Sequence, residues 1–207
     1  SQNRQLVVVI FISYMEPIHT TSEQHKIKIS APEAFCYYGF MAEKLTLVDE
    51  NDQVIGVGDR KQAWANGYYT RNIRVMLGDQ NGRILSQKRS MQKGTYPGMW
   101  TVAASGHVDD GEDWDTAANR ETQEEVGLSA DLVLVGNFIF KNDDGDKKIR
   151  QIIHVYQGFI DESAEFTLQA SEVDEVKWFG LDELKELMRS KPEDFTPSFI
   201  ETIQRFY

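Results

Sequence analysis

The sequence predicts an α/β sandwich rather than a doubly wound parallel sheet. Several extended segments are joined by short turns, the pattern of β-hairpins. Helical segments lie between and after them, so helices are expected on both sides of the sheet. Residues 73–77 illustrate the strand pattern, because Ile73, Val75 and Leu77 alternate with Arg74 and Met76. At 207 residues, the chain is long enough for one large domain, or for one domain with an extension.

The first half of the chain divides into an extension and a series of hairpins. Residues 1–43 are weakly patterned, with an expected strand at 6–12 and a polar break at 19–24. Residues 44–207 form the expected domain. Its first elements are strands at 44–48 and 53–57, followed by a helix at 59–66 that Asp59 caps and Gly67 ends. Strands at 73–77 and 83–88 follow, with the turn 79–82 between them.

The second half alternates strands with longer helices. We expect a strand at 100–105 and a helix at 113–126, closed by Gly127 in a left-handed cap. Two strands at 132–140 and 148–159 are joined by the turn 142–145, and a last strand covers 172–178. Helices at 181–189 and 197–205, separated by Pro192, complete the pattern.

Composition and charge exclude several classes of protein. The net charge is −11 and no long Lys/Arg cluster is present, which argues against nucleic-acid binding and against anionic membranes. The longest apolar run, residues 6–12, is too short to span a bilayer, and no signal-peptide cleavage pattern follows it. A single cysteine, Cys36, excludes an intrachain disulfide and a thiolate metal cage. A reducing, cytoplasmic location is therefore expected.

Carboxylates are concentrated on the predicted helix at 113–126. Residues 109–125 contain eight Asp or Glu and one base, Arg120. Glu121, Glu124 and Glu125 are spaced i, i+3 and i+4, so they share one helix face and repel one another. A divalent cation with oxygen ligands would remove that repulsion, whereas an ordinary solvated acidic face is the alternative explanation. Arg120 is placed to orient a carboxylate.

This segment resembles the Nudix box, G-x5-E-x7-R-E-U-x-E-E-x-G-U, where U is aliphatic. Only one aliphatic position departs from it, at Thr122. The resemblance implies a Nudix-like α/β/α sandwich around a mixed β-sheet, dependence on Mg²⁺ or Mn²⁺, and hydrolysis of a nucleoside diphosphate-linked substrate. The matching residues are Gly106, Glu112, Arg120, Glu121, Glu124, Glu125, Gly127 and Leu128.

The resemblance also implies roles for these residues. Glu124 and Glu125 would be the principal metal ligands, assisted by the Gly106 carbonyl. Glu121 would ligate the metal or act as the general base, oriented by Arg120, and members of the family differ in which residue is the base. The implied catalytic residues are thus Glu121, Arg120 and Glu124. Glu172 and Glu175 are further candidates for ligand or base, or else ordinary strand residues.

Beyond the box, residues 44–207 resemble the Nudix branch that contains type I isopentenyl diphosphate isomerase and a group of bacterial hydrolases. The isomerase resemblance implies a Cys immediately before the box glycine, but this chain has Ser105, a far weaker acid. The implied metal-binding His and Glu are also missing from residues 70–73 and 149–151, and only His107 remains. An isomerase is therefore disfavoured.

The sequence predicts a metal-dependent pyrophosphohydrolase acting on a small diphosphate metabolite. The resemblance implies Arg89 and Lys93 as candidate substrate-binding cations, because they lie in the stretch that approaches the diphosphate in the isomerase, and Arg71 is a third candidate. Cations there would hold phosphate oxygens and locally offset the net charge of −11. The alternatives are the isomerase and a non-catalytic module that senses a nucleotide. Neither a nucleic acid nor a membrane is an expected partner, and residues 1–43 could be a specificity flap, an added strand or a homodimer contact.

Overall fold

A computed structural model describes residues 27–29 and 44–207 of the chain. The expected strand at 6–12, the polar break at 19–24 and Cys36 lie outside the described residues. No helix among the described residues is both long enough and apolar enough to cross a membrane.

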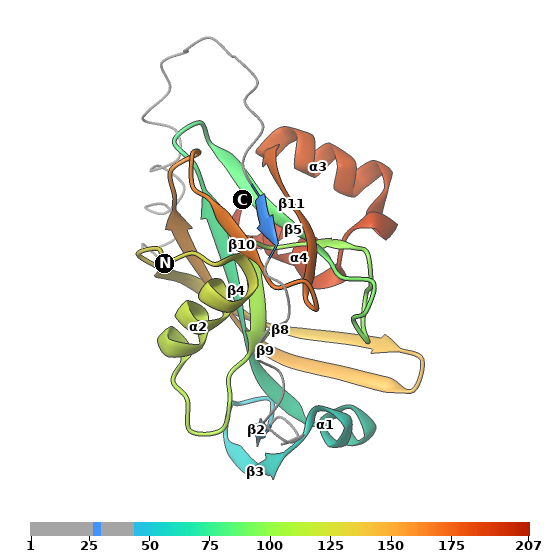
Figure 1. Cartoon of the computed structure of the whole chain (residues 1–207). Helices are drawn as coiled ribbons and strands as arrows, with labels where there is room; N and C mark the ends of the chain where they lie inside the picture. The colour runs from blue at the N-terminus through green and yellow to red at the C-terminus, as the bar shows by residue number, and fades with distance from the viewer. Residues whose placement is uncertain (1–26, 30–43) are drawn as a thin grey trace, which may run out of the picture.

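The structure contains one large mixed sheet, a small two-stranded sheet and helices on either side (Figure 1). The strands are β1 (Ile27–Ile29), β2 (Leu45–Val48), β3 (Val54–Gly58), β4 (Tyr69–Gly78), β5 (Arg83–Arg89), β6 (Trp100–Thr101), β7 (Ala104–His107), β8 (Val133–Asp144), β9 (Lys147–Phe159), β10 (Phe166–Leu168) and β11 (Val173–Gly180). The helices are α1 (Arg60–Asn66), α2 (Trp114–Val126), α3 (Leu181–Ser190), the 3₁₀ turn η2 (Pro192–Asp194) and α4 (Pro197–Phe206).

Strand β4 organises the large sheet. Along one edge it runs parallel to β9, with residues 70–78 in register with 151–159. Its other edge pairs in turn with β2, β7 and β5, all antiparallel. The β8–β9 hairpin and β11 extend the sheet on the two sides. One parallel pair among antiparallel ones makes the sheet mixed, as expected.

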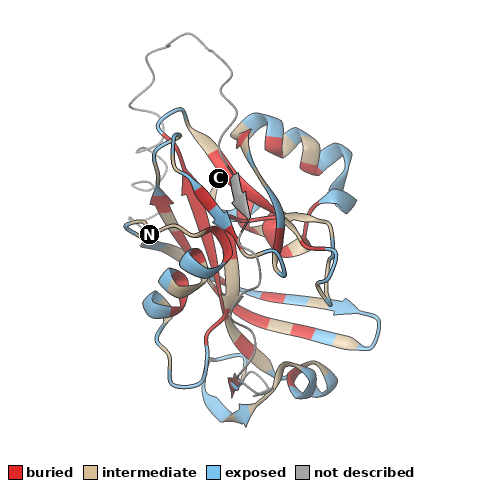
Figure 2. Cartoon of the chain, viewed as in Figure 1, coloured by how far each residue is buried: buried red, intermediate tan, exposed pale blue. Residues whose placement is uncertain are grey.

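Helices cover both faces of the sheet, which confirms the α/β/α sandwich. On one face, Ala117, Ala118 and Val126 of α2 pack against Ile73 and Val75 of β4 in one buried cluster. On the other face, a second cluster joins the sheet to Leu184 of α3 and Phe199 of α4. Figure 2 shows the buried positions along the strands between these layers. The period-two pattern of β4 therefore separates the two cores.

The helix boundaries predicted from capping residues are confirmed. Asp59 accepts a hydrogen bond from the backbone N–H of Gln62 at the start of α1, and Gly67 ends it with φ +70°. Asp113 accepts one from Thr116 N–H at 2.8 Å at the start of α2, and Gly127 ends it with φ +72°. These caps satisfy backbone groups that have no partner within the helix.

Several elements differ from the expectation. Residues 100–105 do not form one strand: β6 pairs with β5 and β7 with β4, so the chain crosses between neighbours at 102–103. Strand β8 continues to Asp144, so only the end of the predicted turn at 142–145 lies in the hairpin loop. The short strand β10, which pairs with β1, was not predicted because its three residues carry no periodicity.

Candidate active site

Helix α2 places its carboxylates beside strand β7 and the loop that follows it. Its buried alanines pack on the sheet, and the ring of Trp114 stacks on His154 of β9 with centroids 3.6 Å apart. At the departing aliphatic position, Thr122 is buried and its hydroxyl donates to Ala118 O at 2.7 Å. The threonine is therefore satisfied within the helix, and the acidic face keeps its orientation.

Arg120 connects this acidic face to the preceding loop. Its Nε and Nη2 donate to the two oxygens of Glu112 at 2.8 Å each, a bidentate ion pair. Its Nη1 donates to Glu121 Oε1 at 2.7 Å and, at 3.4 Å, to Glu124 Oε2. Nη2 also donates to His107 O at 3.0 Å. One guanidinium therefore fixes three carboxylates and the end of β7.

Glu112 holds the loop rather than facing the cavity. Besides Arg120, its Oε2 accepts a hydrogen bond from Asp109 N–H at 3.0 Å. Burial alone would raise the pKa of the Glu112 carboxyl, but its hydrogen bonds from Arg120 and Asp109 hold that pKa below its usual value. The same contacts raise the pKa of Arg120, so this pair stays ionised.

Glu125 is the most deeply buried carboxylate of the group, with 3% of its surface exposed. Its Oε2 accepts hydrogen bonds from Gln87 Nε2 at 2.6 Å and from Ser105 N–H at 2.8 Å. Both partners are neutral, and no ion pair neutralises Glu125 within the part of the chain that the structure describes. Burial raises its pKa, and the negative charge of Glu172 adds to the effect.

Glu121 lies directly against Gly106 of β7. A Cβ atom at position 106 would overlap the Glu121 carboxylate, so only glycine lets this side chain approach the strand. Burial raises the pKa of Glu121, and the neighbouring charge of Glu125 raises it further despite the contact with Arg120. Glu124 differs from both, since half of its side chain is exposed.

These residues fit a divalent cation, although no three Asp, Glu, His or Cys side chains in the described part of the chain are grouped as a ready metal site. The oxygens of Glu121 and Glu124 are directed to Arg120, and one oxygen of Glu125 is directed to Gln87. Burial nonetheless destabilises the charged forms of Glu121 and Glu125, and the charges of Glu125 and Glu172, respectively, add to this effect. A hard cation would supply the missing positive charge, and Gly106 provides the space beside Glu121.

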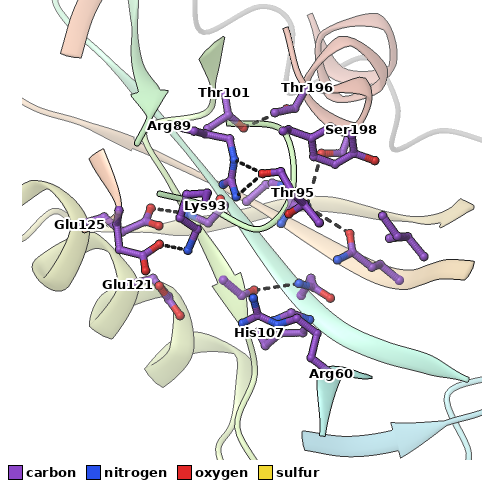
Figure 3. A pocket seen from close by; sticks show the side chains of 18 of the residues that line it. Arg60, Arg89, Lys93, Thr95, Thr101, His107, Glu121, Glu125, Thr196 and Ser198 are labelled. Carbon is purple, nitrogen blue, oxygen red and sulfur yellow. Dashed lines mark hydrogen bonds and ion pairs between the residues drawn. The ribbon is translucent and has the colours of Figure 1, made fainter. Parts of the chain in front are cut away.

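A cavity of about 220 Å³ opens beside the carboxylates. In Figure 3, Glu121 and Glu125 lie on the side of α2, Thr196 and Ser198 lie on the side of α4, and Arg89, Lys93 and Thr95 lie between them. The cavity therefore has an acidic end and an end that presents hydroxyl and amide groups. Its lining includes Asn72, Arg74, Arg89, Lys93, Ser105, Gly106, His107, Glu121, Glu124, Glu125, Gln151, Glu172 and Ser198.

The structure brings together two of the three candidate substrate-binding cations. Arg89 lines the cavity and donates Nε and Nη2 to Thr95 O, at 3.2 and 3.1 Å. Lys93 also lines it and forms an ion pair with Glu172. Arg71 is not among the lining residues; its Nε pairs with Asp52 Oδ1 at 2.7 Å and its guanidinium lies over Trp114. Glu175 is exposed and also lies outside the lining.

A family comparison identifies the domain that carries this site. The model of the NUDIX domain matches residues 68–199, which is more than half of the chain and includes α2, β7 and most of the cavity. The chain belongs to the Nudix family.

The Nudix relatives carry two different names. An isopentenyl-diphosphate Delta-isomerase of Serratia proteamaculans is 32% identical over 161 residues, covering 77% of this chain and 89% of its own. An uncharacterised Nudix hydrolase of Pseudomonas aeruginosa is 28% identical over 165 residues, covering 80% of this chain and 94% of its own. A crystal structure from Deinococcus radiodurans shares the fold, with a TM-score of 0.67 at 22% identity; the match covers 80% of this chain and 99% of that one.

The segments in which the isomerase resemblance implies a thiol, a histidine and carboxylates contribute three side chains to the cavity lining. Ser105 presents a hydroxyl immediately before Gly106, and Asn72 and Gln151 present amides. Asn72 Nδ2 donates to Gly106 O at 3.3 Å, so it supports the box glycine. His107 is buried in the lining. These four side chains therefore offer one imidazole, one hydroxyl and two amides.

Sequence reasoning missed several residues of this Nudix site. Arg74 follows the alternation of β4 and looks like an exposed strand residue, yet it is buried beneath α4. The one sequence feature that could have indicated this burial is the presence of a charged residue among apolar ones in the strand predicted at 73–77. Gln87, which supports Glu125, and Ser198, which lines the cavity from α4, gave no signal, because amides and hydroxyls are common on solvated surfaces.

Proposed function

We propose that this chain is a divalent-metal-dependent pyrophosphohydrolase that cleaves a small diphosphate-containing metabolite. The observation that carries the proposal is the arrangement of the cavity, in which carboxylates of α2 lie at one end and Arg89 and Lys93 lie next to them. Diphosphate cleavage needs charge neutralisation on the phosphate oxygens and an oriented water, and this arrangement suits both.

In this proposal Glu121, Glu124, Glu125 and the carbonyl of Gly106 hold Mg²⁺ or Mn²⁺. The cation would supply charge neutralisation at the phosphate oxygens and lower the pKa of water. Arg120 keeps Glu121 and Glu124 in place through its hydrogen bonds. Gln87 and the Ser105 amide do the same for Glu125. Preorganised groups of this kind need no rearrangement when charge develops.

Proton transfer is assigned to Glu121. Its carboxylate lines the α2 end of the cavity, where the diphosphate would lie in this proposal, and a carboxylate there can accept a proton from the attacking water. Glu124, more exposed and nearer bulk water, is the alternative base. Arg89 binds the diphosphate, since its half-buried guanidinium donates hydrogen bonds only to the Thr95 carbonyl among the described residues. Lys93 assists once the substrate competes with Glu172 for its charge.

The isomerase is the second candidate, supported by the names of relatives such as that of Serratia proteamaculans. Isomerisation of a prenyl diphosphate requires an acid and a base that act on carbon. At the wall of the cavity, Ser105, Asn72 and Gln151 offer a hydroxyl and two amides, which cannot exchange protons with carbon near neutral pH. The chemistry of these side chains therefore favours hydrolysis.

A hydrolysis screen tests the proposal. The full chain with Mg²⁺ is incubated with nucleoside triphosphates, sugar nucleotides, dinucleotide cofactors, CoA and prenyl diphosphates, and products are identified by mass spectrometry. We expect one class to be cleaved at its diphosphate, with loss of cleavage in Glu124→Gln. Silence across the panel, combined with a nucleotide that raises the melting temperature, would favour a binding module. Isomerisation of a prenyl diphosphate without cleavage would establish the second candidate instead.

A further inference from the structure

Arg74 of β4 is a buried cation whose protein partners are all neutral. Only 7% of its surface is exposed. Its Nη1 donates to Ile73 O at 2.8 Å, and its Nη2 donates to Gln151 Oε1 at 3.1 Å and to Ser198 Oγ at 3.3 Å. No carboxylate forms an ion pair with it among the described residues. Burying a charge without a counterion is costly, so its retention calls for an explanation.

The guanidinium of Arg74 has N–H donors that its protein contacts do not use. Its Nε is buried and has no hydrogen-bond partner within the described ranges 27–29 and 44–207. A guanidinium has more N–H donors than its contacts with Ile73, Gln151 and Ser198 use, and their planar arrangement matches a carboxylate or a phosphate. Because Arg74 lines the cavity, a ligand can supply the anionic partner that the protein does not.

A second arginine increases the positive charge at this place. Burial lowers the pKa of Arg74 to about 10, the charge of Arg89 contributes to that lowering, and the charges of Glu125 and Glu121 offset only part of it. Burial lowers the pKa of Arg89 as well. Arg74 remains protonated near neutral pH even so. The two guanidinium groups therefore repel each other inside the same cavity, which an anion bound there would relieve.

Arg74 and the metal-binding carboxylates approach the cavity from different layers of the sandwich. Arg74 shares a sheet face with Met76, on the side covered by α4, and Ser198 belongs to α4 itself. Glu121 and Glu125 belong to α2, which covers the opposite face. Arg89 lies between the α2 carboxylates and Ser198 in Figure 3. A diphosphate held by the α2 carboxylates and Arg89 thus leaves Arg74 for another group of the substrate.

We propose that Arg74, Gln151 and Ser198 form an oxyanion subsite that binds a carboxylate or phosphate of the substrate other than the diphosphate undergoing cleavage. Arg74 supplies the charge, and the Gln151 amide and the Ser198 hydroxyl each have a donor to offer. The inference rests on the proposed function, because it places the diphosphate at the α2 end. It narrows the substrate class to diphosphate-linked metabolites with a further oxyanion, and it excludes a prenyl tail from this end of the cavity.

Matched ligand pairs test the subsite. NADPH and NADH differ by one phosphate, and UDP-glucuronate and UDP-glucose differ by one carboxylate, so the two pairs distinguish the two sources of the oxyanion. Dissociation constants are measured calorimetrically with Mg²⁺ in a Glu124→Gln background, with and without Arg74→Met. Arg74→Lys keeps the charge in case the methionine variant does not fold. Arg150→Met is the matched control, since Arg150 lies on β9 next to Gln151 but pairs with Asp143 outside the cavity.

We expect the oxyanion-bearing member of at least one pair to bind about tenfold more tightly, the worth of one charged hydrogen-bonded contact. Arg74→Met should remove that preference, Arg74→Lys should keep part of it, and Arg150→Met should leave it intact. Equal affinity within both pairs would overturn the inference. If Arg74→Met weakens the binding of both members of a pair equally, the inference is also overturned, because Arg74 would then bind the diphosphate that the two members share. Turnover that survives in Glu124→Gln would contradict the proposed function separately.

Discussion

Arg120→Met is expected to reduce kcat/KM by about 100-fold, the scale of a misplacement of about 1 Å among catalytic groups. The substitution removes a guanidinium that forms ion pairs with Glu112, Glu121 and Glu124. It also removes the hydrogen bond that Arg120 Nη2 donates to His107 O, a bond that positions the end of β7. The loop before α2 and the acidic face of α2 would then lose their common support, and repulsion between Glu121 and Glu125 would be offset less.

The measurement is steady-state kinetics on the compound that the screen identifies, with the metal concentration varied. Arg83→Met is the matched control, because Arg83 pairs with Asp79 and Glu162 away from the cavity. Circular dichroism confirms folding of both variants. If Arg120→Met retains turnover within twofold of the parent protein, Arg120 does not position the carboxylates and the assigned role is wrong.

The second large effect is a dependence of stability on pH and on metal. Glu121 and Glu125 have pKa values raised above those of ordinary glutamates, first of all by burial. The folded state therefore binds protons more tightly than the unfolded state at these groups. Since stability falls with rising pH wherever the folded state binds more protons, the metal-free protein should lose stability as pH rises above the usual glutamate range, about 4.3.

Divalent metal should reverse this loss. Mg²⁺ competes with protons for the same carboxylates, so the increase in melting temperature on adding Mg²⁺ should be larger at pH 8.5 than at pH 6. A change of about 1 kcal/mol corresponds to roughly 2–4 °C for a chain of this size, which differential scanning fluorimetry resolves. A metal-induced shift that is independent of pH would contradict the assignment of Glu121 and Glu125 as ligands.

Glu125→Gln removes the negative charge at this position while keeping the shape of the side chain. The amide oxygen that it introduces can still accept the hydrogen bonds from Gln87 and the Ser105 amide, because both donate to one oxygen of Glu125. We expect the variant to be less sensitive to high pH without metal and to respond weakly to Mg²⁺. Glu201→Gln on α4 is the control, since Glu201 pairs with Arg205 on the surface.

Much of this site could be predicted because its residues are close together in the sequence. Glu121, Glu124 and Glu125 share a helix face by spacing alone, and the caps Asp113 and Gly127 locate that helix. The resemblance to the Nudix box added Gly106, and the structure gives its physical reason, the approach of the Glu121 carboxylate.

The residues that could not be predicted come from other parts of the chain. Gln87 reaches Glu125 from β5, and Ser198 reaches Arg74 from α4, 124 positions away. Such pairings depend on the order of strands in the sheet, which local patterns do not determine. Arg71 was expected to bind the substrate, but on the central strand it faces Asp52 and Trp114 rather than the cavity. Charge alone does not indicate which face of a strand a side chain occupies.

The source of the oxygen atom in the product distinguishes hydrolysis of a diphosphate from isomerisation. Whichever compound of the panel is turned over is incubated in water enriched in ¹⁸O, with Mg²⁺ or with EDTA, and the products are weighed by mass spectrometry. The proposed function predicts two phosphate-containing products, one ¹⁸O atom in one of them, and no reaction in EDTA or with Glu124→Gln. A product with the mass of the substrate and no ¹⁸O, or turnover that persists in EDTA, would contradict it.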